Sequence, residues 1–184
     1  MKEIKVKDLM VPLKEYATVF QEADLCEAIL ALEEAQQEFD RSHYLHRAIL
    51  VYDEKRKIVG KISQLDVIRG LEPKYEQILD LKTLRRFGYS ANQLDQMMKG
   101  YQLWQRPLEN ICRESAQRKV KEIMYVPSEQ ECVSEDATLD EAIHQLIMGA
   151  HQSLLVLRGE YVVGVLRLTD VFKEICNRVK ACKI

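Results

Sequence analysis

The sequence predicts an α/β (α+β) fold in which two β-α-β-β-α units flank a helical insert. The first observation is a duplication: "IVGKISQLDVI" at residues 58–68 and "VVGVLRLTDVF" at 162–172 share a Gly that is followed six residues later by an Asp. The second is a helical stripe of apolar residues upstream of each copy, and the third is a pair of β-rich runs joined by a polar turn. A unit this short needs a neighbour to cover its apolar face. We therefore divide the chain at 1–70, 71–117 and 118–184.

The duplication extends to the start of each unit. "KVKDLM" at 5–10 matches "KVKEIM" at 119–124, and "ADLCEAILAL" at 23–32 matches "ATLDEAIHQL" at 137–146, both 114 residues later. At the Gly and Asp the offset is 104, because the first copy has a longer segment between its first helix and the next strand. We expect "VKDLM" and "VKEIM" to form short helical turns, each leading its own unit.

Within each unit, the period of the apolar residues predicts the elements. A short β run at 17–20 or 131–134 comes first. An amphipathic helix follows, with apolar residues at i, i+3, i+4 and i+7 from Leu25 or Leu139. Asp24 and Thr138 stand where N-caps are expected. Two β runs (48–52 and 58–62, or 153–157 and 161–166) then form a hairpin, and a second helix starts near Gln64 or Leu168.

The insert at 71–117 is predicted to be helical because it has few β-branched residues. One helix is expected over 73–87, with Gly88 as its stop. Ser90 is expected to cap a second helix over 91–104, and Pro107 to break the segment before a last short piece. Its large apolar residues argue against a flexible linker.

Composition excludes several classes of function. The net charge of −2 gives no global basic field for nucleic acid. No apolar stretch approaches the ~20 residues that cross a bilayer, and the N-terminus has no signal-peptide core, so a cytoplasmic location is the default expectation. The five Cys form no C-x-x-C pair and the four His form no helical ligand pair, so no metal site is expected.

The repeated Gly and Asp suggest a nucleotide cradle. Gly60 lets backbone approach a ligand closely. Ser63 stands at a helix start, where unpaired N–H groups favour an anion such as phosphate. Asp66, one turn on, carries two acceptor oxygens that match the two vicinal hydroxyls of a ribose. The alternative is structural: Ser63 is then an N-cap, and Asp66 compensates the helix dipole.

The ordered set of these motifs, present twice, resembles the CBS (cystathionine-β-synthase-type) domain, and two in tandem resemble a Bateman module. The resemblance covers residues 4–70 and 118–179 and leaves out the insert. It implies that the units pack sheet to sheet with pseudo-two-fold symmetry. It also implies clefts between them that bind AMP, ADP, ATP or S-adenosylmethionine, and a pair that forms a homodimer.

Carried over residue by residue, the resemblance assigns ribose contacts to Asp66 and Asp170, and a phosphate contact to Ser63. Arg167 stands where the second copy should have Ser or Thr. It either binds a phosphate, or it has a structural role and fills the cleft or forms an ion pair with an acid. Basic residues entering the second strand, namely His46, Arg47 and His151, are further phosphate candidates or simply loop polarity. The base pocket falls on Tyr16, Ala17, Thr18 and Val19 in the first site, with Asp66, and on Gln130, Glu131, Cys132 and Val133 in the second site, with Asp170.

No catalytic set of residues accompanies these motifs, so neither an enzyme nor a catalytic cofactor is predicted. We expect a regulatory module that senses an adenosine-containing nucleotide and passes the signal to an effector protein in trans. The alternative is a ligand-free pair that serves as a dimerisation scaffold, which the departure at Arg167 favours.

Overall fold

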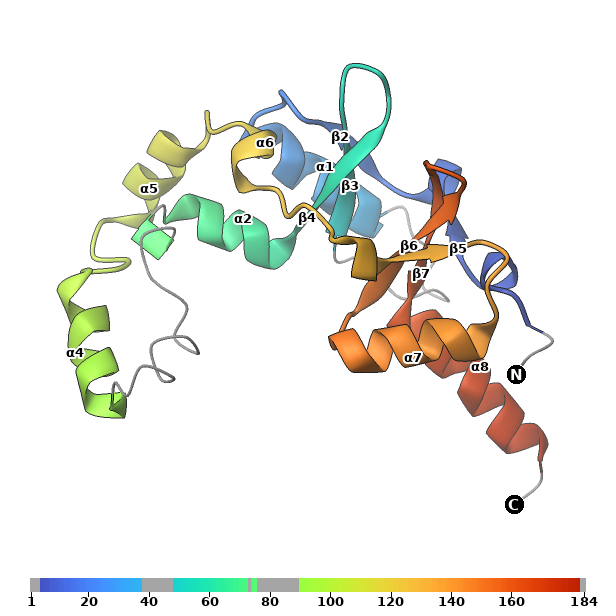
Figure 1. The fold of residues 1–184 in the computed structure, drawn as a ribbon. Coiled ribbons are helices and arrows are strands. Elements are labelled where there is room, and N and C mark those ends of the chain that lie inside the picture. The colour runs from blue at the N-terminus through green and yellow to red at the C-terminus, as the bar shows by residue number, and fades with distance from the viewer. Residues whose placement is uncertain (1–3, 38–47, 73, 76–89, 183–184) are drawn as a thin grey trace.

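Both predicted units are present in the computed structural model, which describes residues 4–37, 48–72, 74–75 and 90–182 (Figure 1). The elements of the first unit are β2 (Thr18–Phe20), α1 (Leu25–Gln37), β3 (Ala48–Tyr52), β4 (Ile58–Ser63) and α2 (Gln64–Leu71). Those of the second are β5 (Cys132–Ser134), α7 (Leu139–Gly149), β6 (Ser153–Arg158), β7 (Tyr161–Arg167) and α8 (Leu168–Ala181). The β-α-β-β-α order predicted for each unit is therefore confirmed.

The two units have the same sheet topology. In the first sheet the order is β2-β3-β4, with β2 parallel and β4 antiparallel to the central β3. In the second, β5 is parallel and β7 antiparallel to the central β6. Both hairpins contain a residue with positive φ, Arg56 at 61° and Gly159 at 60°, and only Gly adopts that conformation without steric cost.

The predicted helix starts are formed by side-chain caps. At α1, the N–H of Glu27 donates to Asp24 Oδ1 at 2.9 Å, and the N–H of Asp24 donates to Glu27 Oε2 at 2.8 Å. At α7, the N–H of Thr138 donates to the carboxylate of Glu141 at 2.9 Å. Such reciprocal caps satisfy N–H groups that have no partner within the helix, which explains why both helices begin at these positions.

The two leading turns form, but each packs on the opposite unit. They are η1 (Val6–Asp8) and α6 (Val120–Ile123). The N–H of Val6 donates to Ala137 O in the second unit, at 3.0 Å, and that of Val120 donates to Ala23 O in the first, at 2.9 Å. The expectation that each turn leads its own unit is therefore wrong. Because the two copies are so similar in sequence, either turn could pack on either unit. The path of the chain determines which turn packs on which unit.

The segments that follow these turns cross over in the same way. β1 (Val11–Pro12) adds to the second sheet, where Val11 pairs with Val165 in an antiparallel register. The equivalent bridge in the first unit joins Tyr125 to Lys61. The two bridges are related by the internal duplication, so the crossover obeys the predicted pseudo-two-fold symmetry.

Three clusters of apolar side chains hold this arrangement together. Each unit has a core between its sheet and its helices, and each core includes the leading turn of the other unit through Val120 or Val6. The third cluster joins the two sheets and contains Val11, Tyr16, Leu50, Leu155 and Val165. The predicted packing of sheet against sheet is thus made by side chains of β1, β3, β6 and β7.

The insert leaves the first unit at the end of α2 and forms an arm that includes α4 (Ala91–Gly100) and α5 (Leu108–Ser115) (Figure 1). Ser115 Oγ donates to Leu71 O at 3.1 Å, which fastens α5 to α2. Ser90 caps α4 as predicted, accepting from the N–H of Gln93 at 3.3 Å. The helix predicted over 73–87, with its stop at Gly88, lies almost wholly outside the described residues.

The second insert helix is shorter than predicted and ends at Gly100. Gln102 and Trp104 have φ of 51° and 57°, in the left-handed region that an α-helix cannot contain. Trp104 is fixed there by its N–H, which donates to Glu72 Oε2 at 3.1 Å. Within the described part of the chain, no helix combines the length and apolar character that a membrane span requires.

Candidate functional site

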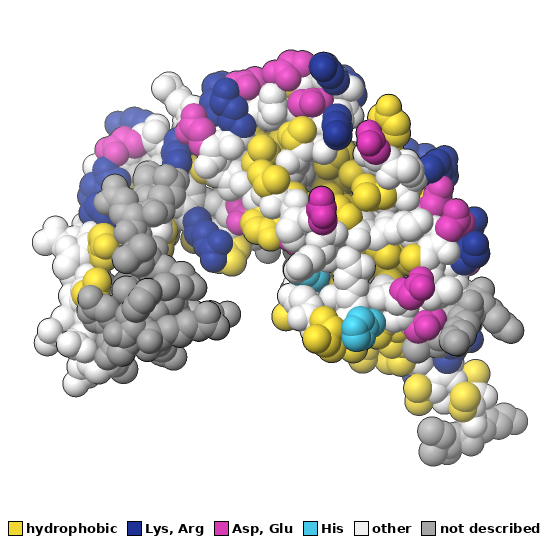
Figure 2. Space-filling model, viewed as in Figure 1, with side chains coloured by type: hydrophobic (Ala, Val, Ile, Leu, Met, Phe, Trp, Pro, Cys, Tyr) yellow, Lys and Arg dark blue, Asp and Glu magenta, His cyan; other side chains and the backbone are white. Residues whose placement is uncertain are grey.

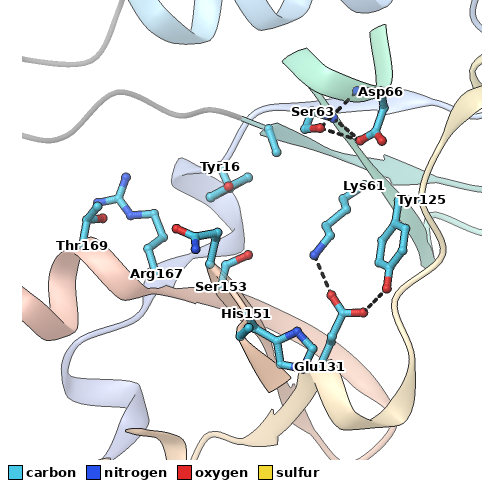
Figure 3. A pocket seen from close by; sticks show the side chains of 13 residues that line it. Tyr16, Lys61, Ser63, Asp66, Tyr125, Glu131, His151, Ser153, Arg167 and Thr169 are labelled. Atoms are coloured by element: carbon cyan, nitrogen blue, oxygen red, sulfur yellow. Dashed lines mark hydrogen bonds and ion pairs between the residues drawn. The ribbon is translucent and has the colours of Figure 1, made fainter. Parts of the chain in front are cut away.

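A cavity of about 660 Å³ lies between the two units (Figure 3). It contains six of the residues that the sequence singled out: Tyr16, Ser63, Asp66, Glu131, His151 and Arg167. The other residues on its wall were not assigned to a site from sequence: Ala48, Lys61, Tyr125, Ala150, Gln152, Ser153 and Thr169. Both units contribute, so the cavity exists only because the two copies face each other.

One end of the cavity is formed by the start of α2. The carboxylate of Asp66 accepts from the N–H of Ser63 at 2.8 Å and from its hydroxyl at 2.6 Å, both through Oδ2. Ser63 Oγ in turn accepts from the N–H of Asp66 at 3.3 Å. The capping role considered for these residues is therefore real. Among the described residues no hydrogen bond ends on Asp66 Oδ1, so this oxygen can still accept from a ligand hydroxyl.

Arg167, at the other end of the cavity, forms an ion pair at the start of α8. Arg167 donates to Asp170 from Nε to Oδ2 at 2.5 Å and from Nη2 to Oδ1 at 2.7 Å. The two side chains are 9 % and 17 % exposed. Of the two roles open for Arg167, the geometry gives the ion pair. Asp170, a predicted ribose contact, does not line the cavity, and both its oxygens are taken by the guanidinium.

Tyr16 lies beside this ion pair. Burial raises the pKa of its phenol to about 12, with a smaller opposing effect of Arg167 and a reinforcing one of Asp170. The hydroxyl therefore stays neutral at physiological pH and keeps its proton as a hydrogen-bond donor.

A second ion pair crosses the boundary between the units. Lys61 Nζ, on β4, is 2.7 Å from Glu131 Oε2 in η4 (Glu129–Glu131). The hydroxyl of Tyr125 donates to the other oxygen of the same carboxylate (Figure 3). Burial acts to raise the pKa of Glu131, but the hydrogen bonds from Lys61 and Tyr125 outweigh it, and the pKa is lowered overall. The hydrogen bond to Glu131 raises the pKa of Tyr125.

His151 lies on the cavity wall between these two ends. Its Nε2 is buried and has no hydrogen-bond partner in the described part of the chain. The ring occupies the space above Gly149: a Cβ at position 149 would be 1.9 Å from Nε2. The chain then turns at Ala150, whose φ is 51°. A buried ring nitrogen without a partner costs free energy, so this atom is a candidate to bind a ligand.

The predicted base-pocket residues are mostly not on the cavity wall. Val19 and Val133 point into the two cores. The side-chain amide of Gln145 donates to the backbone oxygens of Gln130, at 2.6 Å, and Cys132, at 2.9 Å. The carbonyl of Ala17 accepts from Leu50, and Thr18 is exposed. Only Tyr16 and Glu131 of these predicted sets face the cavity, while His46 and Arg47 lie outside the described residues.

The crossover also changes which segment accompanies which acid. Sequence reasoning grouped Tyr16 with Asp66, but Tyr16 lies close enough to Asp170 for its charge to affect the phenol. In the same way Tyr125, in the leading segment of the second unit, lies close enough to Asp66 for that charge to raise the pKa of its phenol, after the larger effects of the Glu131 hydrogen bond and burial. The cause is again that each leading segment joins the sheet of the other unit.

Lys61 could have been found from the sequence. Side chains alternate along a strand, so Lys61 must share a face with Ser63, two residues on. Gly60 and Ile62, which point to the opposite face of the strand, are buried, as that alternation requires. Thr169, one residue before Asp170, also lies on the cavity wall. No group of three or more metal-ligating side chains occurs among the residues that the structure describes.

Comparisons with known proteins agree with this architecture. The CBS domain family matches residues 6–73 and 120–177. A CBS domain-containing protein from Bacillus anthracis is 19 % identical, with 96 % of each chain covered and a TM-score of 0.64. The CBS domain of a bacterial CNNM/CorC family Mg²⁺ transporter in complex with ATP is 18 % identical, with 95 % and 89 % covered and a TM-score of 0.61. CBSX2 in complex with AMP is 15 % identical, with 95 % and 97 % covered and a TM-score of 0.59. No curated protein matches the sequence.

Proposed function

The chain belongs to the CBS domain family, and on that premise we propose that it is a regulatory module that binds an adenosine-containing nucleotide between its two units. The observation that carries the proposal is the cavity itself. Its volume of about 660 Å³ lies in the range of small-molecule sites, and both units supply its polar groups. Two solved structures of the same fold are complexes with ATP and AMP, which supports this class of ligand.

The Asp66 end is the proposed ribose site. A sugar with two vicinal hydroxyls needs acceptors, and Asp66 lines the cavity while its cap with Ser63 uses Oδ2 alone. The cap fixes the rotamer of the carboxylate before the ligand arrives, so little conformational entropy is lost on binding. Phosphate oxygens would meet the helix start at Ser63 and the cationic or neutral donors Lys61 and His151.

A ligand in this position touches both units and so biases how they pack. Its effect is limited to the difference between its affinities for the two arrangements. We propose that the arm of α4 and α5 presents the result to an effector protein in trans. The arm carries exposed apolar side chains, Met97, Trp104 and Leu108, which suit a protein partner.

We also propose that the chain forms a homodimer through its outer helices. These outer helices are α1, α2, α7 and α8. Large apolar side chains are exposed on each of them, and Figure 2 shows hydrophobic surface over α7. The internal symmetry relates Ile68 on α2 to Phe172 on α8, and these are 49 % and 61 % exposed. Matched apolar residues on two-fold-related faces are what a symmetric dimer interface needs.

A ligand-free dimerisation scaffold remains a second candidate, favoured by the ion pair through which Arg167 occupies the carboxylate of Asp170. Calorimetric titration with adenosine, AMP, ADP, ATP and S-adenosylmethionine separates the two. We expect at least one of them to bind and to raise the melting temperature. An Asp66→Asn variant should lose that binding, because the amide supplies one acceptor oxygen and no charge, yet it can still cap α2. Asp95→Asn, on the exposed surface of α4, is the control. Absence of binding by every compound would favour the scaffold.

A further inference from the structure

The internal symmetry of the fold is broken at one place on the cavity wall. Lys61, Tyr125 and Glu131 form a connected polar group there. The duplication relates these positions to apolar residues on the other side: Val165, Val11 and Ala17. Burying a lysine and a glutamate where the other half uses Val and Ala costs solvation free energy. The polar group is therefore not needed to form the fold, which its apolar counterpart achieves equally well.

The lysine in this group faces the cavity from a position next to the proposed ligand. Lys61 and Ser63 lie on the same face of β4, and both line the cavity. The side chain of Lys61 is 22 % exposed, whereas that of Glu131 is only 4 % exposed. Both residues line the cavity, and the ammonium is the more accessible part of the pair for a ligand.

The carboxylate would not be left without partners if the lysine moved away. Glu131 also accepts from the hydroxyl of Tyr125 and from the N–H of Ser128, at 3.3 Å. Two donors would remain on its Oε1, and the space that the ammonium leaves opens onto the cavity. The lysine can therefore change its anionic partner at a lower cost than in an isolated buried pair.

We propose that Lys61 is an exchangeable cation: in the empty cavity it is bound to Glu131, and on binding it transfers to the phosphate of the ligand. Glu131 then acts as an internal competitor for the phosphate. Lys61 favours phosphorylated nucleotides over the uncharged nucleoside, because only an anionic group can take the place of the carboxylate, and Glu131 limits how strongly the phosphate is bound. This inference rests on the proposed function and adds how that site discriminates its ligands.

The exchange also identifies the contact through which ligand binding would affect the packing of the two units. Lys61 belongs to the first sheet and Glu131 to η4, next to the second. Transfer of the ammonium removes this ion pair between units. The backbone bridge remains, with Lys61 N donating to Tyr125 O at 2.9 Å and Tyr125 N donating to Lys61 O at 2.8 Å. Binding would loosen the contact at η4 around a bridge that stays intact.

Calorimetric titration with AMP and with adenosine tests the exchange. Glu131→Gln removes the competing charge, so we expect AMP to bind several-fold more tightly than to the wild type and adenosine to bind unchanged. Lys61→Met should weaken the binding of AMP by about tenfold or more, again with little effect on the binding of adenosine. Glu129→Gln in the same turn and Lys57→Met in the β3–β4 hairpin, both exposed, are the matched controls and should bind like the wild type.

Tyr125→Phe gives an independent check that changes no charge. Without the hydroxyl, Glu131 depends more on Lys61, so AMP should bind more weakly while adenosine is unaffected. AMP affinity that is unchanged or reduced in Glu131→Gln, or unchanged in Lys61→Met, would overturn the exchange while leaving nucleotide binding itself established. Failure of the wild type to bind either compound would overturn the exchange together with the proposed function.

Discussion

Arg167 holds both carboxylate oxygens of Asp170, at 2.5 and 2.7 Å, whereas the equivalent Asp66 is held through one oxygen only. The difference follows from one substitution in the repeated motif, in which Ser63 is replaced by Arg at position 167. A serine hydroxyl engages one carboxylate oxygen, while a guanidinium engages two. The two acids that look alike in sequence are therefore unequal as acceptors.

This asymmetry predicts how many ligands the chain binds. We expect the wild type to take one nucleotide per chain, at the Asp66 end. Arg167→Ser should free Asp170 and raise the stoichiometry towards two, measured by calorimetric titration with the nucleotide that binds the wild type. The new serine can also cap α8, so the fold should be retained.

Arg178→Ser is the control for that variant. Arg178 also forms an ion pair on α8, with Glu174 Oε1 at 2.6 Å, but it does not line the cavity. The Arg178→Ser variant should therefore still bind one nucleotide per chain. A wild-type chain that already binds two nucleotides would contradict the proposed blocking role of Arg167.

A second prediction concerns the place of the His151 ring. Because a Cβ at Gly149 would lie 1.9 Å from Nε2, Gly149→Ala must displace the ring. The imidazole is the movable part, so we expect the protein to fold normally. Nucleotide affinity should fall to the level of His151→Ala, even though the histidine is still present.

Gly100→Ala provides the matched control, since Gly100 also ends a helix but has nothing within 4 Å of the added Cβ. It should not change binding, and melting curves should show both alanine variants to be folded. If Gly149→Ala binds like the wild type, the ring of His151 does not contact the ligand.

The Lys61–Glu131 pair predicts a pH dependence of stability. The pKa of Glu131 is lowered from its ordinary value of 4.5, so its ionised form stabilises the folded state. That contribution is present above the unfolded pKa and is lost as the pH falls through the lower folded pKa. Urea unfolding at pH 7 should show Glu131→Gln to be less stable than the wild type by about 1–3 kcal/mol.

The difference between these two proteins should shrink as the pH is lowered from 5 towards 3, because the wild-type carboxylate is then protonated as well. Glu129→Gln, which removes an exposed acid from the same turn, should stay close to the wild type at neutral pH. A gap between wild type and Glu131→Gln that is constant over this range would show that the charge of Glu131 does not stabilise the fold.

The last prediction tests the proposed dimer. Phe172 is 61 % exposed on α8, so Phe172→Glu should not disturb the core. Placed in a symmetric interface, the new charges would face each other, and light scattering at micromolar concentration should give half the wild-type mass. Lys173→Glu changes the charge of the neighbouring exposed residue and should remain dimeric. A wild type that is already monomeric would refute the interface.

Much of the fold followed from local patterns in the sequence. The strand and helix limits were close to those observed, because apolar periodicity and caps such as Asp24 act over a few residues. The second insert helix was overestimated at its C-terminus. Its end depends on Glu72, distant in sequence, which holds the N–H of Trp104.

The candidate site was predictable to the extent that it repeats. Ser63, Asp66, Arg167 and His151 were found because the duplication, or the family pattern, marks them. Lys61 and Tyr125 have apolar counterparts in the other copy, so a search for matched residues passed over them. The signal that would have found Lys61 is its position on the same face of the strand as Ser63.

The sequence by itself determined that there are two copies of one unit, where their elements begin and end, and which acid recurs. Only the tertiary structure decided which leading turn packs on which unit, and therefore which side chains meet in the cavity. The physical reason is that "KVKDLM" and "KVKEIM" offer nearly the same apolar surface and hydrogen bonds to either copy. Local chemistry cannot choose between them, and the choice is made by how the whole chain can pass from one sheet to the other.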